Sequence, residues 1–271
     1  MLLASLVIGL GVPRLPAGER ITFHEVPSAA IGRSLPVAVI APEETAPSPS
    51  AVLFFLHGRG RHHRSLLESP AGAATRQALL RAPFFVVLPQ GEDGWYIDSP
   101  ALPAARYQAY LEEVIAWTGR TFPVARNRER RGIAGWSMGG YGAVRFAQAH
   151  PDDFGFVASI IGLLDFPRPE DLPAGQNYRV PTARFTADPT VWAAFNPLAA
   201  VARLRDTRVQ LVLATRGFER TMNERFIAAL HAGGMEPEVH WLEGGHEFPL
   251  VERAVPLVID AATRSFQNRP R

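Results

Sequence analysis

Two residue types are missing from the 271-residue sequence, which contains no cysteine and no lysine. The absence of cysteine excludes a disulfide framework, thiolate zinc sites, iron–sulfur clusters and a cysteine nucleophile. The 28 basic residues are therefore all arginines, which excludes a Schiff-base lysine and the lysine of a phosphate-binding loop. Any catalytic chemistry must use side chains other than thiols and lysine amines.

The sequence also lacks a strong excess of charge of either sign. Its 28 basic residues are matched by 26 acidic ones, which leaves a net charge of +2. The basic run of Arg126, Arg128, Arg130 and Arg131 has no interleaved aromatic residues, so we interpret it as a solvated edge before a strand. We therefore expect no nucleic-acid partner.

No hydrophobic run is long enough to cross a bilayer, which takes about 20 apolar residues. The apolar stretch at residues 2–12 has the length of a signal-peptide core, but no basic residue precedes it. Residues 1–18 are therefore interpreted either as the remnant of a signal peptide or as an N-terminal extension. We favour export, and hence a secreted or periplasmic location over a cytoplasmic one, without stable membrane insertion.

Short β-rich runs occur along the chain, and the later ones alternate with helix-like segments. The expected strands lie at residues 21–26, 35–40, 52–56, 84–88, 132–135, 156–161, 209–214 and 238–242. The expected helices lie at residues 104–121, 141–150, 223–232 and 250–266. This order predicts an α/β fold with a mostly parallel sheet of about eight strands and helices on both faces. No linker divides the chain, so we expect a single domain over residues 19–271.

The sequence Gly135-Trp-Ser-Met-Gly139 matches the G-x-S-x-G pattern of a nucleophile elbow. An apolar strand leads into it and a helix rich in small residues follows it, as a strained strand-to-helix turn requires. Ser137 is therefore the candidate nucleophile. The N–H of Met138, at the start of the helix, is a candidate donor to an oxyanion.

A serine nucleophile needs a general base, and after a nucleophile elbow the base is expected beyond the last strand. His246 lies at this position, in the sequence Glu243-Gly-Gly-His-Glu247. The other histidines lie before the nucleophile, in helices or in strand patterns. The pair His62-His63 has no nearby acidic ligands to complete a metal site, so we expect no metal and no cofactor.

The third member of a catalytic triad should be a carboxylate between Ser137 and His246 in the chain, at the end of a strand. Glu219 follows the expected strand at 209–214 and precedes the next helix. Asp165 follows the preceding strand and is the alternative. We favour Glu219, and both assignments stay open.

A second oxyanion donor should come from the loop after the strand at 52–56. That loop reads His57-Gly-Arg-Gly60, and the backbone N–H of Arg59 is the candidate donor. The side chain of Arg59 is either solvated or contacts an acidic group of the substrate.

With these motifs the chain resembles the esterase D branch of the α/β-hydrolases, which includes S-formylglutathione hydrolases, tributyrin and feruloyl esterases and mycolyltransferases. The matching segments are Leu56-His-Gly58, Gly94-Trp-Tyr-Ile-Asp98, Gly135-Trp-Ser-Met-Gly-Gly-Tyr-Gly142, Trp192 with Asn196-Pro197, and Gly244-Gly-His246. The resemblance implies an α/β-hydrolase fold, Ser137 as nucleophile, His246 as base, and main-chain donors from Met138 and Arg59. The loop that carries Glu219 differs from the pattern of the esterase D branch. Members of the branch usually have Gly-x-x-Asp at this place, whereas this chain has Gly217-Phe-Glu-Arg220.

The same resemblance indicates which residues border the substrate. Trp95 and Tyr96 either line the cleft or pack over the edge of the sheet, and His57 lies in the oxyanion loop. The Pro-rich span at residues 166–197 is expected to form a cap over the nucleophile. Trp192 in this span either lines an acyl or aryl pocket or anchors the cap.

The sequence therefore predicts a serine carboxylesterase that cleaves small-molecule esters, such as acetyl or feruloyl esters, through an acyl-enzyme. One alternative is an acyltransferase of the same family, in which an alcohol takes the place of water. The other is a catalytically inactive hydrolase-like module that only binds. The sequence makes no prediction of the oligomeric state.

Overall fold

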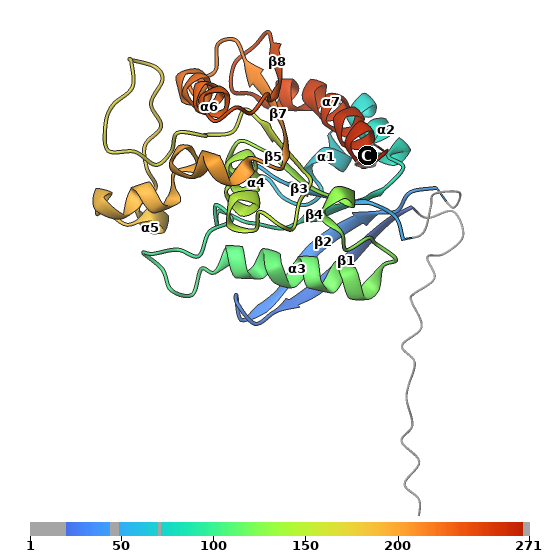
Figure 1. The fold of residues 1–271 in the computed structure, drawn as a ribbon. Helices are drawn as coiled ribbons and strands as arrows, with labels where there is room; N and C mark the ends of the chain where they lie inside the picture. The colour runs from blue at the N-terminus through green and yellow to red at the C-terminus, as the bar shows by residue number, and fades with distance from the viewer. Residues whose placement is uncertain (1–19, 44–48, 70–71, 268–271) are drawn as a thin grey trace, which may run out of the picture.

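The computed structural model describes residues 20–43, 49–69 and 72–267. The expected signal remnant or extension at residues 1–18 lies outside the described residues. The centre of the fold is an eight-stranded sheet (Figure 1). Its strands are β1 (Ile21–Ser28), β2 (Arg33–Ile40), β3 (Val52–Leu56), β4 (Phe85–Pro89), β5 (Arg131–Trp136), β6 (Phe156–Ile160), β7 (Arg208–Ala214) and β8 (Glu238–Leu242).

The strands lie side by side in the order β1-β2-β4-β3-β5-β6-β7-β8. β2 pairs antiparallel with both β1 and β4, whereas every neighbouring pair from β4 to β8 is parallel. The predicted, mostly parallel sheet of about eight strands is therefore confirmed. Because the parallel strands point the same way, their carboxyl ends meet at one edge of the sheet, where α/β proteins place their binding sites.

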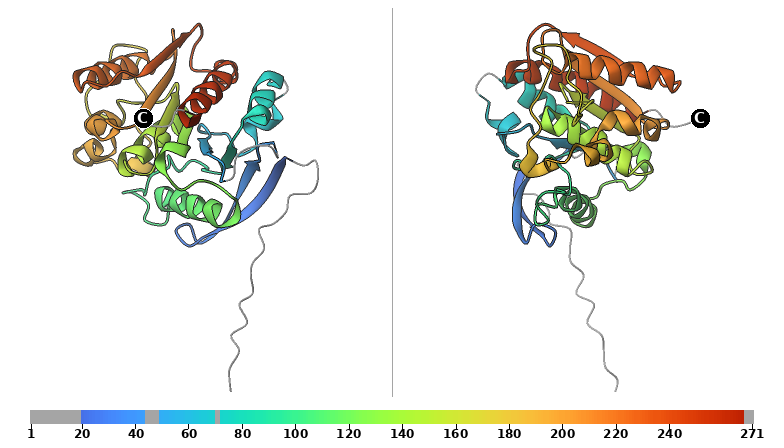
Figure 2. Two further views of the ribbon diagram at one scale, coloured as in Figure 1. Left: turned by 45° about the vertical axis from the view of Figure 1, so that its right-hand side comes forward. Right: turned by 90° about the vertical axis from the view of Figure 1, so that its left-hand side faces the viewer.

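Helices cover both faces of the sheet, as the two views of Figure 2 show. The helices on the first face are α3 (Tyr107–Thr121), α4 (Met138–Ala149) and α6 (Arg220–Ala232). The helices on the second face are α1 (Ser65–Glu68), α2 (Ala73–Arg81) and α7 (Phe248–Gln267). In β3, Phe54 packs toward the first face and Phe55 toward the second, so the strand is buried on both sides. Burial on both sides explains why its sequence is apolar throughout.

All four helices expected from the sequence form, with ends shifted by a few residues. α4 begins at Met138 rather than at residue 141, because its first turn is rich in glycine and carries no periodic apolar signal. α2 was not expected, since only Thr75 and Leu79 of its nine residues are buried. Among the helices that the structure describes, none combines the length and the apolar character needed to span a bilayer.

Between β6 and β7 the chain passes through a crossover segment, defined here as residues 166–197. The segment contains the short helix α5 (Thr182–Phe185) and the 3₁₀ helix η2 (Pro189–Phe195), and η3 (Pro197–Leu204) leads on toward β7. Phe185 is fully buried and packs on Trp95, with ring centroids 5.3 Å apart. An aromatic contact thus anchors the segment to the core of the fold. Its role as a cap over Ser137 stays a prediction.

Candidate active site

Ser137 lies in the sharp turn between β5 and α4, with φ +53° and ψ −119°. This left-handed region is strained for a residue with a side chain. The two flanking glycines allow the turn to pack tightly. A Cβ on Gly135 would overlap the backbone of Gly139, and a Cβ on Gly139 would overlap the carbonyl of Leu56. The sequence pattern therefore reflects close backbone contacts on both sides of Ser137.

A line of two hydrogen bonds joins Ser137 to His246 and His246 to Glu219. The hydroxyl oxygen of Ser137 lies 2.8 Å from Nε2 of His246. Nδ1 of the same imidazole lies 2.8 Å from Oε2 of Glu219. Because a carboxylate can only accept, Nδ1 carries the ring proton and Nε2 is free to accept the proton of the Ser137 hydroxyl.

Glu219 comes from the turn between β7 and α6 and is fully buried. It occupies the N-cap position of α6, and its side chain makes no hydrogen bond to the helix end. Gly217 gives the side chain room, because a Cβ at that position would overlap the carboxylate group of Glu219. The sequence Gly217-Phe-Glu-Arg220 thus makes a compact turn around a buried acid.

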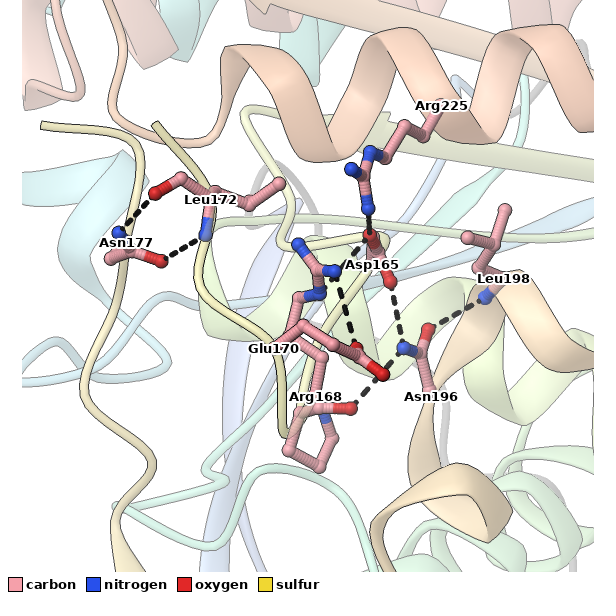
Figure 3. Close-up of polar contacts among 9 residues, drawn as sticks. Asp165, Arg168, Glu170, Leu172, Asn177, Asn196, Leu198 and Arg225 are labelled. Carbon is pink, nitrogen blue, oxygen red and sulfur yellow. Dashed lines mark hydrogen bonds and ion pairs between the residues drawn. The ribbon is translucent and has the colours of Figure 1, made fainter. Parts of the chain in front are cut away.

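Asp165 occupies a different environment, shown in Figure 3. Its Oδ1 accepts a hydrogen bond from the side-chain amide of Asn196 at 2.8 Å. Its Oδ2 pairs with Arg225 at 3.2 Å and with Arg168 at 3.5 Å. This buried carboxylate joins the crossover segment to α6. Of the two candidate acids, the structure brings Glu219 and not Asp165 to His246.

The two candidate oxyanion donors come from the start of α4 and from the loop after β3. Met138 is the first residue of α4, so its N–H has no acceptor within the helix. Arg59 lies with Ser137 and His246 around a pocket of about 170 Å³. The apolar residues that line this pocket are Trp136, Ile161, Phe248 and Val251.

His57 is buried in the loop after β3, and both of its ring nitrogens bond to the main chain. Nε2 accepts from the N–H of Gly91 at 2.8 Å, so Nδ1 is protonated and donates to the carbonyl of Gly58, also at 2.8 Å. Burial lowers the pKa of this imidazole to about 4. The expectation that His57 contacts substrate is therefore corrected, because its side chain supports the loop from within the fold.

The depressed pKa of His57 predicts a loss of stability in acid. Between its ordinary pKa of 6.5 and about 4, the unfolded chain binds a proton that the folded chain does not, so stability falls as the pH is lowered. The full shift corresponds to roughly 3 kcal/mol. The free energy of unfolding, measured with denaturant between pH 7 and pH 4, should therefore fall less steeply for His57→Gln than for wild type. His231 is exposed, so His231→Gln is the matched control. If the free energy of unfolding of His57→Gln fell with pH as steeply as that of wild type, the lowered pKa of His57 would be contradicted.

Two other residues expected at the substrate are also buried. Trp95 and Tyr96 are each 1% exposed. The hydroxyl of Tyr96 accepts a hydrogen bond from the N–H of His57 at 3.1 Å, which ties Tyr96 to the loop after β3. For both residues the packing alternative holds, and the expectation of substrate contact is corrected. Trp192 is half-buried and borders a second pocket of about 420 Å³, lined mainly by the crossover segment, rather than the pocket at Ser137.

Three residues that the sequence did not single out lie around Glu219 and His246. The ring of Phe218 packs on the imidazole of His246, with centroids 4.5 Å apart. Tyr178 stacks on Phe218, and Gln176 bonds to the turn that carries Glu219. Phe218 could have been suspected as the neighbour of Glu219. Gln176 and Tyr178 lie in a segment without periodic signal, so no pattern pointed to them.

The sequence matches the family described as "Putative esterase" over residues 28–248. Esterase Rv1288 of Mycobacterium tuberculosis strain H37Rv is 25% identical over 88% of this chain, which spans 58% of that relative's length. An acetyl esterase of Caldicellulosiruptor saccharolyticus is 25% identical over 72% of this chain and 77% of its own.

A solved structure with the same fold is FphF, a fluorophosphonate-binding serine hydrolase of Staphylococcus aureus. It superposes with a TM-score of 0.77 at 20% identity, over 90% of this chain and 98% of its own. This likeness confirms the α/β-hydrolase fold. The family match covers most of the chain and confirms the resemblance inferred from its motifs: the chain belongs to the esterase family.

Proposed function

We propose that the chain is a serine carboxylesterase that uses Ser137 as nucleophile, His246 as general base and Glu219 as the acid that orients the base. The observation that carries this proposal is the pair of 2.8 Å hydrogen bonds linking the three side chains. Similarity to proteins named esterase and acetyl esterase supports an ester as the substrate.

In this mechanism the Ser137 oxygen attacks the ester carbonyl while Nε2 of His246 takes the hydroxyl proton. The N–H groups of Met138 and Arg59 donate to the oxyanion that develops on the carbonyl oxygen. His246 then gives its proton to the departing alcohol, which leaves an acyl group on Ser137. Water, deprotonated by the same imidazole, hydrolyses the acyl-enzyme and regenerates the free serine.

The size of the pocket beside Ser137 favours a short acyl group. Its volume of about 170 Å³ lies below the roughly 300–1,000 Å³ of pockets that enclose drug-sized ligands. We therefore expect kcat/KM for p-nitrophenyl acetate and butyrate to exceed that for the decanoate by about tenfold or more. Methyl ferulate, with a larger acyl group, should be cleaved more slowly for the same reason.

Steady-state kinetics over the acetate-to-decanoate series measures this profile. Val251 lines the pocket from α7, so Val251→Ala should enlarge it and move the optimum toward longer chains. A profile that rises steadily to decanoate in wild type, or one that Val251→Ala leaves unchanged, would contradict this assignment of the acyl pocket.

An added alcohol separates hydrolysis from acyl transfer, because both reactions start from the same acyl-enzyme. Free acid as the main product in the presence of the alcohol is the result expected for an esterase. A predominant new ester would instead identify an acyltransferase, and no turnover of any ester would favour a binding module.

A further inference from the structure

The N-terminus of α6 carries Glu219, and this helix end lacks its usual cap. Glu219 occupies the N-cap position, where a side-chain oxygen ordinarily accepts a hydrogen bond from an N–H of the first helical turn. The Glu219 carboxylate makes no such bond, and its Oε2 instead faces Nδ1 of His246. N–H groups of the first turn that have no acceptor within the helix therefore need one from elsewhere.

Gln176 of the crossover segment supplies that acceptor. Its Oε1 accepts hydrogen bonds from the backbone N–H of Thr221 at 3.0 Å and from the Thr221 hydroxyl at 3.2 Å. Its Nε2 donates to the carbonyl of Gly217 at 3.4 Å. One side-chain amide thus holds both ends of the turn at residues 217–221, with Glu219 in the middle.

Tyr178, two residues further on, reaches the other parts of the site. Its ring stacks on Phe218 with centroids 5.3 Å apart and planes 18° from parallel. Phe218 in turn packs on the imidazole of His246. The hydroxyl of Tyr178 accepts a hydrogen bond from the guanidinium of Arg59 at 3.1 Å, so the same tyrosine also contacts the oxyanion loop.

The position of the Glu219 carboxylate depends strongly on the backbone of its turn. Its Oε1 is buried and has no hydrogen-bond partner among the described residues, so the bond from His246 alone fixes the carboxylate directly. A shift of the turn therefore changes the contact between acid and base. In a catalytic site, a displacement of about 1 Å can lower the rate by about 100-fold.

We propose that Gln176 and Tyr178 are positioning residues for the reaction proposed above, on which this inference rests. Gln176 fixes the turn so that the carboxylate of Glu219 meets Nδ1 of His246. Tyr178 holds the ring of Phe218 against the imidazole. Neither residue touches the reacting atoms, so the crossover segment contributes to catalysis through the acid and the base.

A double-mutant cycle tests whether Gln176 acts through Glu219. The measured quantity is the rate constant for phosphonylation of Ser137 by a fluorophosphonate, followed by intact-protein mass spectrometry so that slow variants remain measurable. Gln176→Ala should lower this rate constant about tenfold in the wild-type background. In the Glu219→Gln background, Gln176→Ala should lower the rate constant less than about twofold, because the carboxylate that Gln176 positions is already gone.

Arg179→Ala is the matched control, since Arg179 lies in the same segment, is exposed and makes no hydrogen bond or ion pair with another described residue. It should react at the wild-type rate, and thermal melts verify that each variant is folded. Equal losses from Gln176→Ala in both backgrounds, or no loss in wild type, would overturn the proposal. A Glu219→Gln single variant that reacts at the wild-type rate would instead contradict the proposed function itself.

Two substitutions of Tyr178 separate its ring from its hydroxyl. Tyr178→Leu removes the stack on Phe218 and should lower kcat about fivefold with little change in KM, the loss expected for one aromatic contact. Tyr178→Phe keeps the ring and should stay within about twofold of wild type. Equal losses in kcat in the two variants, or an effect confined to KM, would overturn the positioning role of the ring.

Discussion

Ser137→Ala should lower kcat for p-nitrophenyl acetate on the order of 10⁴-fold or more, with the fold unchanged. The alanine removes the oxygen that attacks the ester, so no acyl-enzyme can form. Residual turnover would come from binding and from the oxyanion donors alone. The small side chain fits the space that serine vacates, and the turn held by Gly135 and Gly139 stays intact.

Ser34→Ala is the control, because Ser34 is exposed on β2, away from the elbow. It should retain wild-type kinetics. Wild-type activity in a folded Ser137→Ala variant would mean that another group, or a bound water, attacks the ester. The nucleophile assigned here would then be wrong.

Glu219→Gln should lower kcat by about 10³- to 10⁴-fold, a far larger effect than removal of the alternative acid. The amide of glutamine can donate to Nδ1 of His246, which places the ring proton on Nε2. An imidazole in this tautomer cannot accept the proton of Ser137. Because glutamine has nearly the same shape as glutamate, the loss of kcat would come from the changed position of the proton on His246.

Asp165→Asn is the matched substitution at the other buried carboxylate. It should change kcat less than about threefold but lower the melting temperature, because Arg225 and Arg168 lose their buried partner. Kinetics and thermal melts of both variants measure the contrast. The reverse pattern, with activity lost in Asp165→Asn and kept in Glu219→Gln, would identify Asp165 as the acid.

The parts of the structure that the sequence predicted well are encoded within a few neighbouring residues. The elbow needs Ser137 and two glycines within five positions, so its pattern can be recognised in a short stretch of sequence. The strands are recognisable because burial on both faces requires continuous apolar runs, as in β3. The position of His246 near Ser137 could be expected because His246 follows the last strand, in a loop with two glycines.

The parts that could not be predicted depend on contacts between distant segments. Aromatic residues such as Trp95 and Tyr96 occur both in substrate clefts and in hydrophobic cores. The sequence therefore does not distinguish the two environments, and only the tertiary packing shows that these residues are buried. Gln176 is 45 residues from Thr221, and no periodic pattern links a polar side chain to a helix end so far along the chain. The choice between Glu219 and Asp165 likewise depends on distant contacts, because an arginine of the crossover segment and an arginine of α6 both form ion pairs with Asp165.

The proposed mechanism requires that an acyl group passes through Ser137. Rapid-quench peptide mass spectrometry during turnover of p-nitrophenyl acetate tests this most directly. We expect an acetyl group on the peptide that contains Ser137, at its hydroxyl, and none on that peptide in Ser137→Ala. Turnover without an acetylated Ser137, or with the acetyl group on another side chain, would contradict it.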